Sequence, residues 1–275
     1  MHTIKFTKLH GAGNDFILID DRDGGVGDLT PDVIRRLCDR HTGVGADGVM
    51  VLRNDAVCDF AMSYINANGQ PGEMCGNGAR CAAWEAMRLG MGDGEGVTFR
   101  VSGDTYHARR QSDGTVRVRM RAPIRDDRPG RLADLQTAEF PEMAWYDTGV
   151  PHLVMASRDP LDGLDIATLG RYWRHHDRFR PAGVNVNVVR RHPDGGLAVR
   201  VYERGVEGET LACGTGAVAC ALFVMERWGA AAPVRVRFPG GDLVVSLDDD
   251  GETLSLSGPV VRVFTGQLSP EFADR

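Results

Sequence analysis

The chain has 275 residues, of which 42% are hydrophobic and 25% are charged, and its formal net charge is −6. This composition is typical of a folded protein of one or two domains. It has no basic stripe and no apolar run of about 18 residues, so neither nucleic acid nor a membrane is an expected partner.

Cysteine and lysine usage narrows the chemistry further. The six cysteines, at positions 38, 58, 75, 81, 213 and 220, lack the CxxC pairs typical of tetrahedral zinc sites. The N-terminus lacks the long apolar core of a signal peptide, so we expect a cytoplasmic protein with reduced thiols. Only Lys5 and Lys8 occur, and neither lies in a glycine-rich loop, so a pyridoxal phosphate Schiff base is not expected.

The first half of the chain begins with a strand, MHTIKFTKLH, and a glycine corner, HGAGND. A short helix is predicted over residues 31–40, and alternating strands over residues 48–52 and 58–65. An apolar helix over residues 77–89 follows a Cys-Gly corner. The half closes with strands joined at Gly-Asp and Asp-Gly turns across residues 97–120.

The second half repeats this order from the glycine corner TGVPH onward. Its predicted elements are a helix over 166–176, strands over 184–189 and 197–203, a helix over 215–228, and paired strands across 233–257. Cys75 and Cys213 are 138 residues apart, and at this offset the Gly103-Asp104 pair coincides with Gly241-Asp242. We interpret the chain as a duplication. The expected class is α+β, with two pseudo-symmetric domains, each a mostly antiparallel sheet or barrel wrapped around a central helix.

The duplicated Cys-Gly corners, EMCGNGARCAA and LACGTGAVACA, each place a thiol at the predicted start of a helix. Unpaired N–H groups and the helix dipole stabilise a thiolate there and favour anion binding. A carboxylate bound between two such helix starts would have an acidified α-carbon. One thiolate could then remove the α-proton, while the opposite thiol delivers a proton to the other face. This pattern predicts a two-base racemase or epimerase with no metal and no organic cofactor.

Over essentially its whole length the chain resembles the diaminopimelate epimerase family, on the motifs HGAGNDF, GADG, MCGNGAR, GVNVN and ERGVEGETLACGTGA. The resemblance implies conversion of LL- to meso-2,6-diaminopimelate, a precursor of lysine and peptidoglycan, by a pyridoxal-independent enzyme that is usually a homodimer. It also implies an N-terminal half over residues 1–120, to which residues 264–275 return, and a C-terminal half over residues 121–263. The active site is expected in the cleft between the halves.

The resemblance assigns roles to particular residues. Cys75 and Cys213 become the two bases, His152 and Glu203 help to set their protonation, and Arg204 pairs with the distal carboxylate. The substrate-contacting set is Asn14, Asn66, Gly76, Asn77, Asn185, Glu203, Arg204, Gly214 and Thr215, with Gly76, Asn77, Gly214 and Thr215 holding the reacting carboxylate.

Three other functions stay open at this point. A proline-racemase-like or other amino-acid racemase would share both thiols, although such enzymes typically carry a Cys-Gly-His-Gly corner where this chain has CGNG. A cysteine hydrolase would need only one of the two thiols. A non-catalytic amino-acid-binding protein would not exchange the α-hydrogen of its ligand with solvent.

Overall fold

The computed structural model describes residues 4–27, 29–125, 132–248, 250–269 and 272. The chain forms two compact units, one of Met1–Val118 with Gly258–Arg275 and one of Arg119–Ser257. The first unit is thus discontinuous in sequence. Of the segment 264–275 that was expected to return to the N-terminal half, residues 270, 271 and 273–275 lie outside the described residues.

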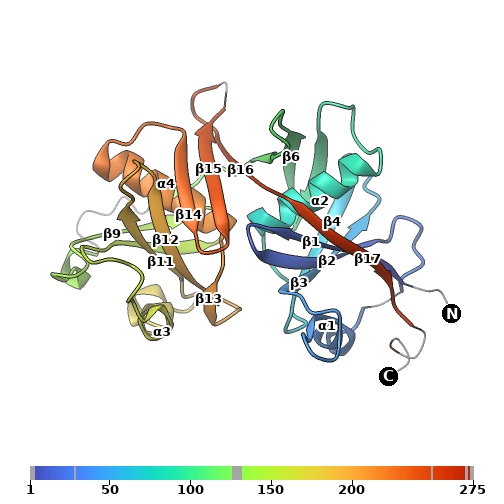
Figure 1. Ribbon diagram of the computed structural model, residues 1–275, viewed down its shortest axis with the longest axis horizontal. Coiled ribbons are helices and arrows are strands. Elements are labelled where there is room, and N and C mark those ends of the chain that lie inside the picture. The colour runs from blue at the N-terminus through green and yellow to red at the C-terminus, as the bar shows by residue number, and fades with distance from the viewer. Residues whose placement is uncertain (1–3, 28, 126–131, 249, 270–271, 273–275) are drawn as a thin grey trace. The chain divides into compact units, whose positions relative to one another are not determined.

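The first unit is a sheet whose strands follow the order β17–β1–β2–β3–β4–β5–β6–β7, with most neighbours antiparallel. Figure 1 shows the last strand, in dark red, beside the first strand, in dark blue. The strands are β1 (Lys5–Gly11), β2 (Asn14–Asp20), β3 (Gly48–Arg53), β4 (Phe60–Asn66), β5 (Val97–Val101), β6 (Asp104–Arg110), β7 (Val116–Arg119) and β17 (Val261–Gln267), and the helices are α1 (Pro31–Cys38) and α2 (Gly76–Arg88).

The second unit repeats this order as β8–β9–β10–β11–β12–β14–β15–β16, with the short strand β13 also paired to β12. The strands are β8 (Ile124–Arg125), β9 (Glu142–Asp147), β10 (Pro151–Ala156), β11 (Asn185–Arg191), β12 (Leu197–Glu203), β13 (Gly208–Thr210), β14 (Val234–Phe238), β15 (Gly241–Leu247) and β16 (Leu254–Gly258), the helices are α3 (Ile166–Arg174) and α4 (Gly214–Trp228), and two 3₁₀ turns cover Ala133–Leu135 and Asp177–Phe179. The matching strand orders confirm the predicted α+β class.

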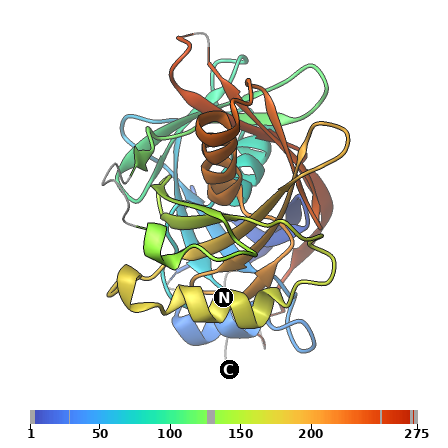
Figure 2. The same ribbon diagram turned by 90° about the vertical axis from the view of Figure 1, so that its left-hand side faces the viewer.

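Each unit wraps its strands around one buried helix, α2 in the first unit and α4 in the second. Figure 2 shows α4 in the middle of its unit with strands around it. Every residue of α4 from Gly214 to Val224 is buried, as expected for a helix that is apolar or small on all sides. In α2 the buried stretch runs from Gly76 to Ala83. Most of its side chains are small, and Asn77 and Arg80 are the buried polar exceptions.

The other helix of each unit, α1 in the first and α3 in the second, packs against an apolar core of its own unit. In α1, Thr30 caps the first turn by accepting from Val33 N, and Ile34 and Leu37 face the core of the first unit. In α3, Asp165 accepts from Thr168 N, and Trp173 packs among the core residues of the second unit.

The two halves do not follow a single offset throughout. The hairpin β5–β6 turns at residues 102–103, whereas β14–β15 turns at residues 239–240. Gly103 therefore corresponds in structure to Gly240, and the predicted match between Gly103 and Gly241 is wrong by one residue.

Helices long and apolar enough to cross a bilayer do not occur in the described part of the chain.

Candidate active site

Cys75 is the N-cap of the buried helix α2, with extended backbone angles of φ −113° and ψ 109°. Its sulfur accepts a hydrogen bond from Gly78 N at 3.4 Å. The first backbone bond of the helix runs from Ala79 N to Cys75 O at 2.8 Å, so the amides of Gly76 and Asn77 precede the helical ladder. The half-buried thiol therefore lies at the positive end of the helix.

Cys213 has the same geometry in the second unit. It is the N-cap of α4, with φ −125° and ψ 119°, and its sulfur accepts from Gly216 N at 3.4 Å. The helical ladder begins with Ala217 N to Cys213 O at 2.9 Å, so the amides of Gly214 and Thr215 precede it. The predicted corner is thus present twice, with a thiol as the cap each time.

Three of the other cysteines lie in surroundings that keep them protonated. Burial raises the pKa of Cys38 and of Cys81 to about 12, and it raises the pKa of Cys220 well above the ordinary value. Cys81 and Cys220 lie further along the helices that Cys75 and Cys213 cap. These three thiols are therefore poor nucleophiles and belong to the apolar core.

In the first unit, three side-chain amide contacts lead from a buried cation to a carboxylate. Arg80 donates to Asn77 Oδ1 at 2.7 Å, Asn77 Nδ2 donates to Asn14 Oδ1 at 3.3 Å, and Asn14 Nδ2 donates to Asp47 Oδ2 at 2.6 Å. The sulfur of Cys75 lies 3.7 Å from the same Asn14 Oδ1. This row of hydrogen bonds begins at a charged guanidinium and ends at a carboxylate. The orientation of the Asn14 amide is therefore fixed, with its carbonyl oxygen toward the thiol.

Arg80 is fully buried, and burial lowers its pKa to about 10. The thiols of Cys81 and Cys75, when ionised, act in the opposite direction and raise it. A guanidinium with this pKa is protonated at neutral pH. It therefore supplies a positive charge in the first turns of α2, beside the thiol of Cys75.

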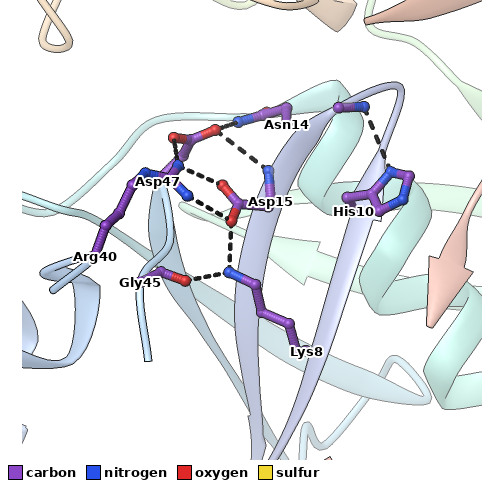
Figure 3. A network of polar contacts seen from close by, with 8 residues as sticks. Lys8, His10, Asn14, Asp15, Arg40, Gly45 and Asp47 are labelled. Atoms are coloured by element: carbon purple, nitrogen blue, oxygen red, sulfur yellow. Dashed lines mark hydrogen bonds and ion pairs between the residues drawn. The ribbon is translucent and has the colours of Figure 1, made fainter. Parts of the chain in front are cut away.

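A second polar layer lies behind Asn14 (Figure 3). Asp15 contacts Lys8 at 2.5 Å and Arg40 at 2.8 Å, and Arg40 also contacts Asp47 at 2.8 Å. Burial acts to raise the pKa of Asp15, but the hydrogen bonds from Arg40 and Lys8 outweigh it and lower the pKa. Burial raises the pKa of Asp47, and the nearby charge of Asp15 adds to this effect. The layer anchors Asp47, which in turn holds Asn14.

In the second unit, a histidine takes the place of Asn14 at the 138-residue offset between the thiols. His152 is fully buried on β10, and its Nε2 lies 2.9 Å from Thr215 Oγ1. Thr215 Oγ1 lies 3.5 Å from the sulfur of Cys213. On its other side, His152 Nδ1 lies 3.0 Å from Nδ2 of Asn187, a residue of β11. Each unit thus links the second residue of its buried helix to a side chain on a neighbouring strand.

The remaining predicted substrate contacts form separate groups. Asn185 accepts from Arg204 N at 2.8 Å and donates to Pro151 O at 3.1 Å, which ties the end of β12 to the start of β10. Glu203 accepts a hydrogen bond from Thr210. In the first unit, Asn66 donates only weakly to the carbonyls of its own turn, at 3.5 Å.

Sequence reasoning did not single out Asn187, Asp47 or Arg80. Asn187 was detectable, because it is two residues beyond Asn185 on a predicted strand and so shares a face with it. Asp47 and Arg80 lie inside motifs that were noted, GADG and MCGNGAR, but a charged residue in such a motif is usually at the surface. Only the structure shows that Arg80 is buried.

The buried His152 should make the protein sensitive to acid. Burial, with a smaller effect from the charge of Arg204, lowers its pKa from 6.5 to about 3. Protonation therefore favours the unfolded chain, and stability present above pH 6.5 is lost as pH falls toward 3. Between pH 7 and pH 5 we expect a loss of about 2 kcal/mol from this residue.

Urea denaturation at both pH values measures this loss, with His152→Gln expected to remove about 2 kcal/mol of the pH dependence. The exposed His107 offers a matched control, since His107→Gln should leave the pH dependence unchanged. Equal pH dependence in wild type and His152→Gln would contradict the assignment.

No group of three or more His, Cys, Asp or Glu residues that could hold a metal ion occurs within the described ranges. The polar groups near the two thiols are amides, the hydroxyl of Thr215, the neutral imidazole of His152 and the guanidinium of Arg80, which suit the binding and protonation of an organic anion.

The fold is shared with solved structures of other proteins. A PhzF-family phenazine biosynthesis protein from Bacillus anthracis superposes with a TM-score of 0.71 over 98% of this chain and 100% of its own, at 14% identity. A hydroxyproline epimerase from Agrobacterium vitis gives a TM-score of 0.69 over 98% and 94% of the two chains, at 16% identity. At these identities the likeness shows the fold alone, a two-domain fold found in both a hydroxyproline epimerase and a PhzF-family protein.

Sequence comparison identifies the family. A sequence model of diaminopimelate epimerase matches residues 6–125 and 144–263. Diaminopimelate epimerases from Chlorobaculum tepidum and Aquifex aeolicus are 41% and 38% identical to the chain, over 95% and 98% of it and over 100% and 99% of their own lengths. The chain belongs to the diaminopimelate epimerase family, a family of isomerases.

Proposed function

We propose that the protein interconverts LL- and meso-2,6-diaminopimelate by a two-base mechanism in which Cys75 and Cys213 act on one α-carbon. The observation that carries the proposal is the repeated cap: each buried central helix begins with a thiol whose sulfur accepts an N–H at 3.4 Å. Family membership supports the choice of substrate.

In the proposed reaction, the sulfur that is a thiolate removes the α-proton and becomes a thiol. The electron pair moves into the carboxylate, and the other thiol donates its proton to the opposite face of the carbon. The amides of Gly76, Asn77, Gly214 and Thr215 stabilise the enediolate charge, because they precede the helical ladders and lie at positive helix ends. No metal and no organic cofactor take part.

The distal end of the substrate carries its second amino-acid group. We assign its recognition to Arg204, through its planar guanidinium, together with Asn66, Asn185 and Glu203. The hydrogen bond from Arg204 N to Asn185 Oδ1 supports this grouping, because it holds the two residues in fixed relation.

Incubation with LL-diaminopimelate in deuterated water tests the function. We expect meso-diaminopimelate carrying deuterium at the inverted α-carbon, detected by chiral chromatography with mass spectrometry. Proline, hydroxyproline and histidine serve as alternative substrates in parallel. Turnover of one of these without turnover of diaminopimelate would favour another amino-acid racemase, and no exchange with any of them would exclude the two-base proposal.

We further propose that the enzyme is a cytoplasmic homodimer. Strand β17 supports the dimer, because it pairs with β1 along one edge while Val261, Val263 and Phe264 stay 44%, 54% and 46% exposed. An exposed apolar edge strand is suited to pairing with a second copy. Val263→Asp should therefore produce a monomer in sedimentation velocity, whereas a monomeric wild type would exclude the dimer.

A further inference from the structure

The side chain of Asn187 is held in one orientation inside the second unit. It is fully buried on β11, and its Nδ2 donates to Leu153 O at 3.2 Å and lies 3.0 Å from His152 Nδ1. A backbone carbonyl can only accept, so the amide must direct its NH₂ group, not its oxygen, toward Leu153 and His152.

This orientation determines which nitrogen of His152 carries the proton. Facing an NH₂ donor, Nδ1 must accept, so the proton of the neutral ring is on Nε2. Nε2 then donates to Thr215 Oγ1 at 2.9 Å. The Thr215 hydroxyl, which accepts this bond, can donate its own proton to a second acceptor. The sulfur of Cys213 lies 3.5 Å from Thr215 Oγ1 and is placed to accept it.

The arrangement has a local cost that packing does not explain. Asn187 Oδ1 is buried without a hydrogen-bond partner in the described structure, and such orphaned acceptors are uncommon. It lies over Gly216, where an added Cβ would come within 2.5 Å of it. An apolar side chain of similar size would remove the orphaned acceptor, but it would also take the NH₂ donor away from Leu153 O and His152 Nδ1, so the amide contributes through its donors.

We propose that Asn187 is a positioning residue of the epimerase, which fixes the Nε2–H form of His152 so that Thr215 donates to the thiolate of Cys213. The inference rests on the proposed function and deepens it. Asn187 acts through His152 and Thr215, which lie between its amide and the sulfur of Cys213. Because the buried ring is neutral, it carries a single proton, and the nitrogen that holds this proton determines whether the ring donates to Thr215.

Nitrogen-15 NMR of the histidine-labelled protein tests the first step. The two neutral tautomers have distinct ring-nitrogen shifts, and the signal lost in His152→Gln identifies the residue. We expect His152 to remain in the Nε2–H form from pH 6 to pH 9. Protonation at Nδ1 in the wild type would overturn the proposal. This readout needs no substrate, so it stays distinct from a failure of the proposed function.

Kinetics test the second step. Asn187→Leu should lower kcat by about 10–100-fold and move the acidic limb of the kcat/KM profile to higher pH, because the thiolate loses an oriented donor. If Asn187 acts through Thr215, then Thr215→Val should have much less effect in Asn187→Leu than in the wild type.

The exposed Asn54 provides the matched control, and Asn54→Leu should leave kcat and the pH profile unchanged. Additive effects of Asn187→Leu and Thr215→Val, or an unmoved acidic limb in Asn187→Leu, would overturn the role assigned to Asn187.

Discussion

The substitutions Cys75→Ser and Cys213→Ser should each lower kcat for diaminopimelate epimerisation by on the order of 10²–10⁴-fold. A serine hydroxyl keeps the cap geometry but is far less acidic than a thiol, so it cannot remove an α-proton at neutral pH. Conversion of LL- to meso-diaminopimelate, followed by chiral chromatography, measures the loss.

The two variants should also differ from each other. With one thiolate left, each variant should exchange the α-hydrogen of only one stereoisomer with deuterated solvent, and the preferred isomer should be opposite in the two. Cys220→Ala is the matched control, since Cys220 lies in the helix that Cys213 caps and its pKa is raised by burial. Near-normal turnover in either serine variant, or the same preferred isomer in both, would contradict the two-base mechanism.

Alanine at Gly216 should be far more damaging than alanine at Gly78, although the two glycines follow their thiols at the same spacing. An added Cβ at Gly216 would come 2.5 Å from Asn187 Oδ1 and 3.2 Å from Cys213 Cβ. Neither neighbour can move freely, because Asn187 is fully buried and Cys213 is the cap. We expect Gly216→Ala to destabilise the protein by about 1–3 kcal/mol and to lower kcat as the thiol is displaced.

Gly78→Ala meets a softer neighbour. Its added Cβ would come 3.2 Å from the sulfur of Met50, and Cys75 Sγ would be 3.6 Å away. Methionine adapts readily to such contacts, so we expect a stability change below about 1 kcal/mol. Urea denaturation and kcat/KM of the two variants measure the contrast, and equal effects would show that Asn187 does not fill the space above Gly216.

The sequence predicted the class of fold and the position of both thiols because these depend on short-range patterns. Cys75 and Cys213 each precede a glycine and an apolar helix, and a helix start has the same unpaired amides in any protein. The strand order could not be predicted in detail. Parallel pairs such as β2–β3 and β10–β11 depend on contacts between distant segments, which no local pattern encodes.

Some of the side chains around the thiols were predicted from the sequence and others were not, because their roles also depend on contacts between distant segments. Asn14 and His152 were assigned by family resemblance, and the structure shows the hydrogen bonds through which they reach the helix starts. Arg80 was missed because charged side chains usually lie at the surface, whereas Arg80 is fully buried. Asn187 was missed because its importance depends on one orientation of an amide, which only a set of neighbours in space can fix.

The sheltered thiols have a practical consequence for labelling. Alkylating reagents attack thiolates, and Cys38, Cys81 and Cys220 hold their protons far into the alkaline range. A brief treatment with iodoacetamide near neutral pH should leave these three thiols unmodified. Peptide mapping, which separates the peptide of Cys58 from those of Cys75 and Cys213, could then follow the two helix-capping sulfurs without replacing any other cysteine.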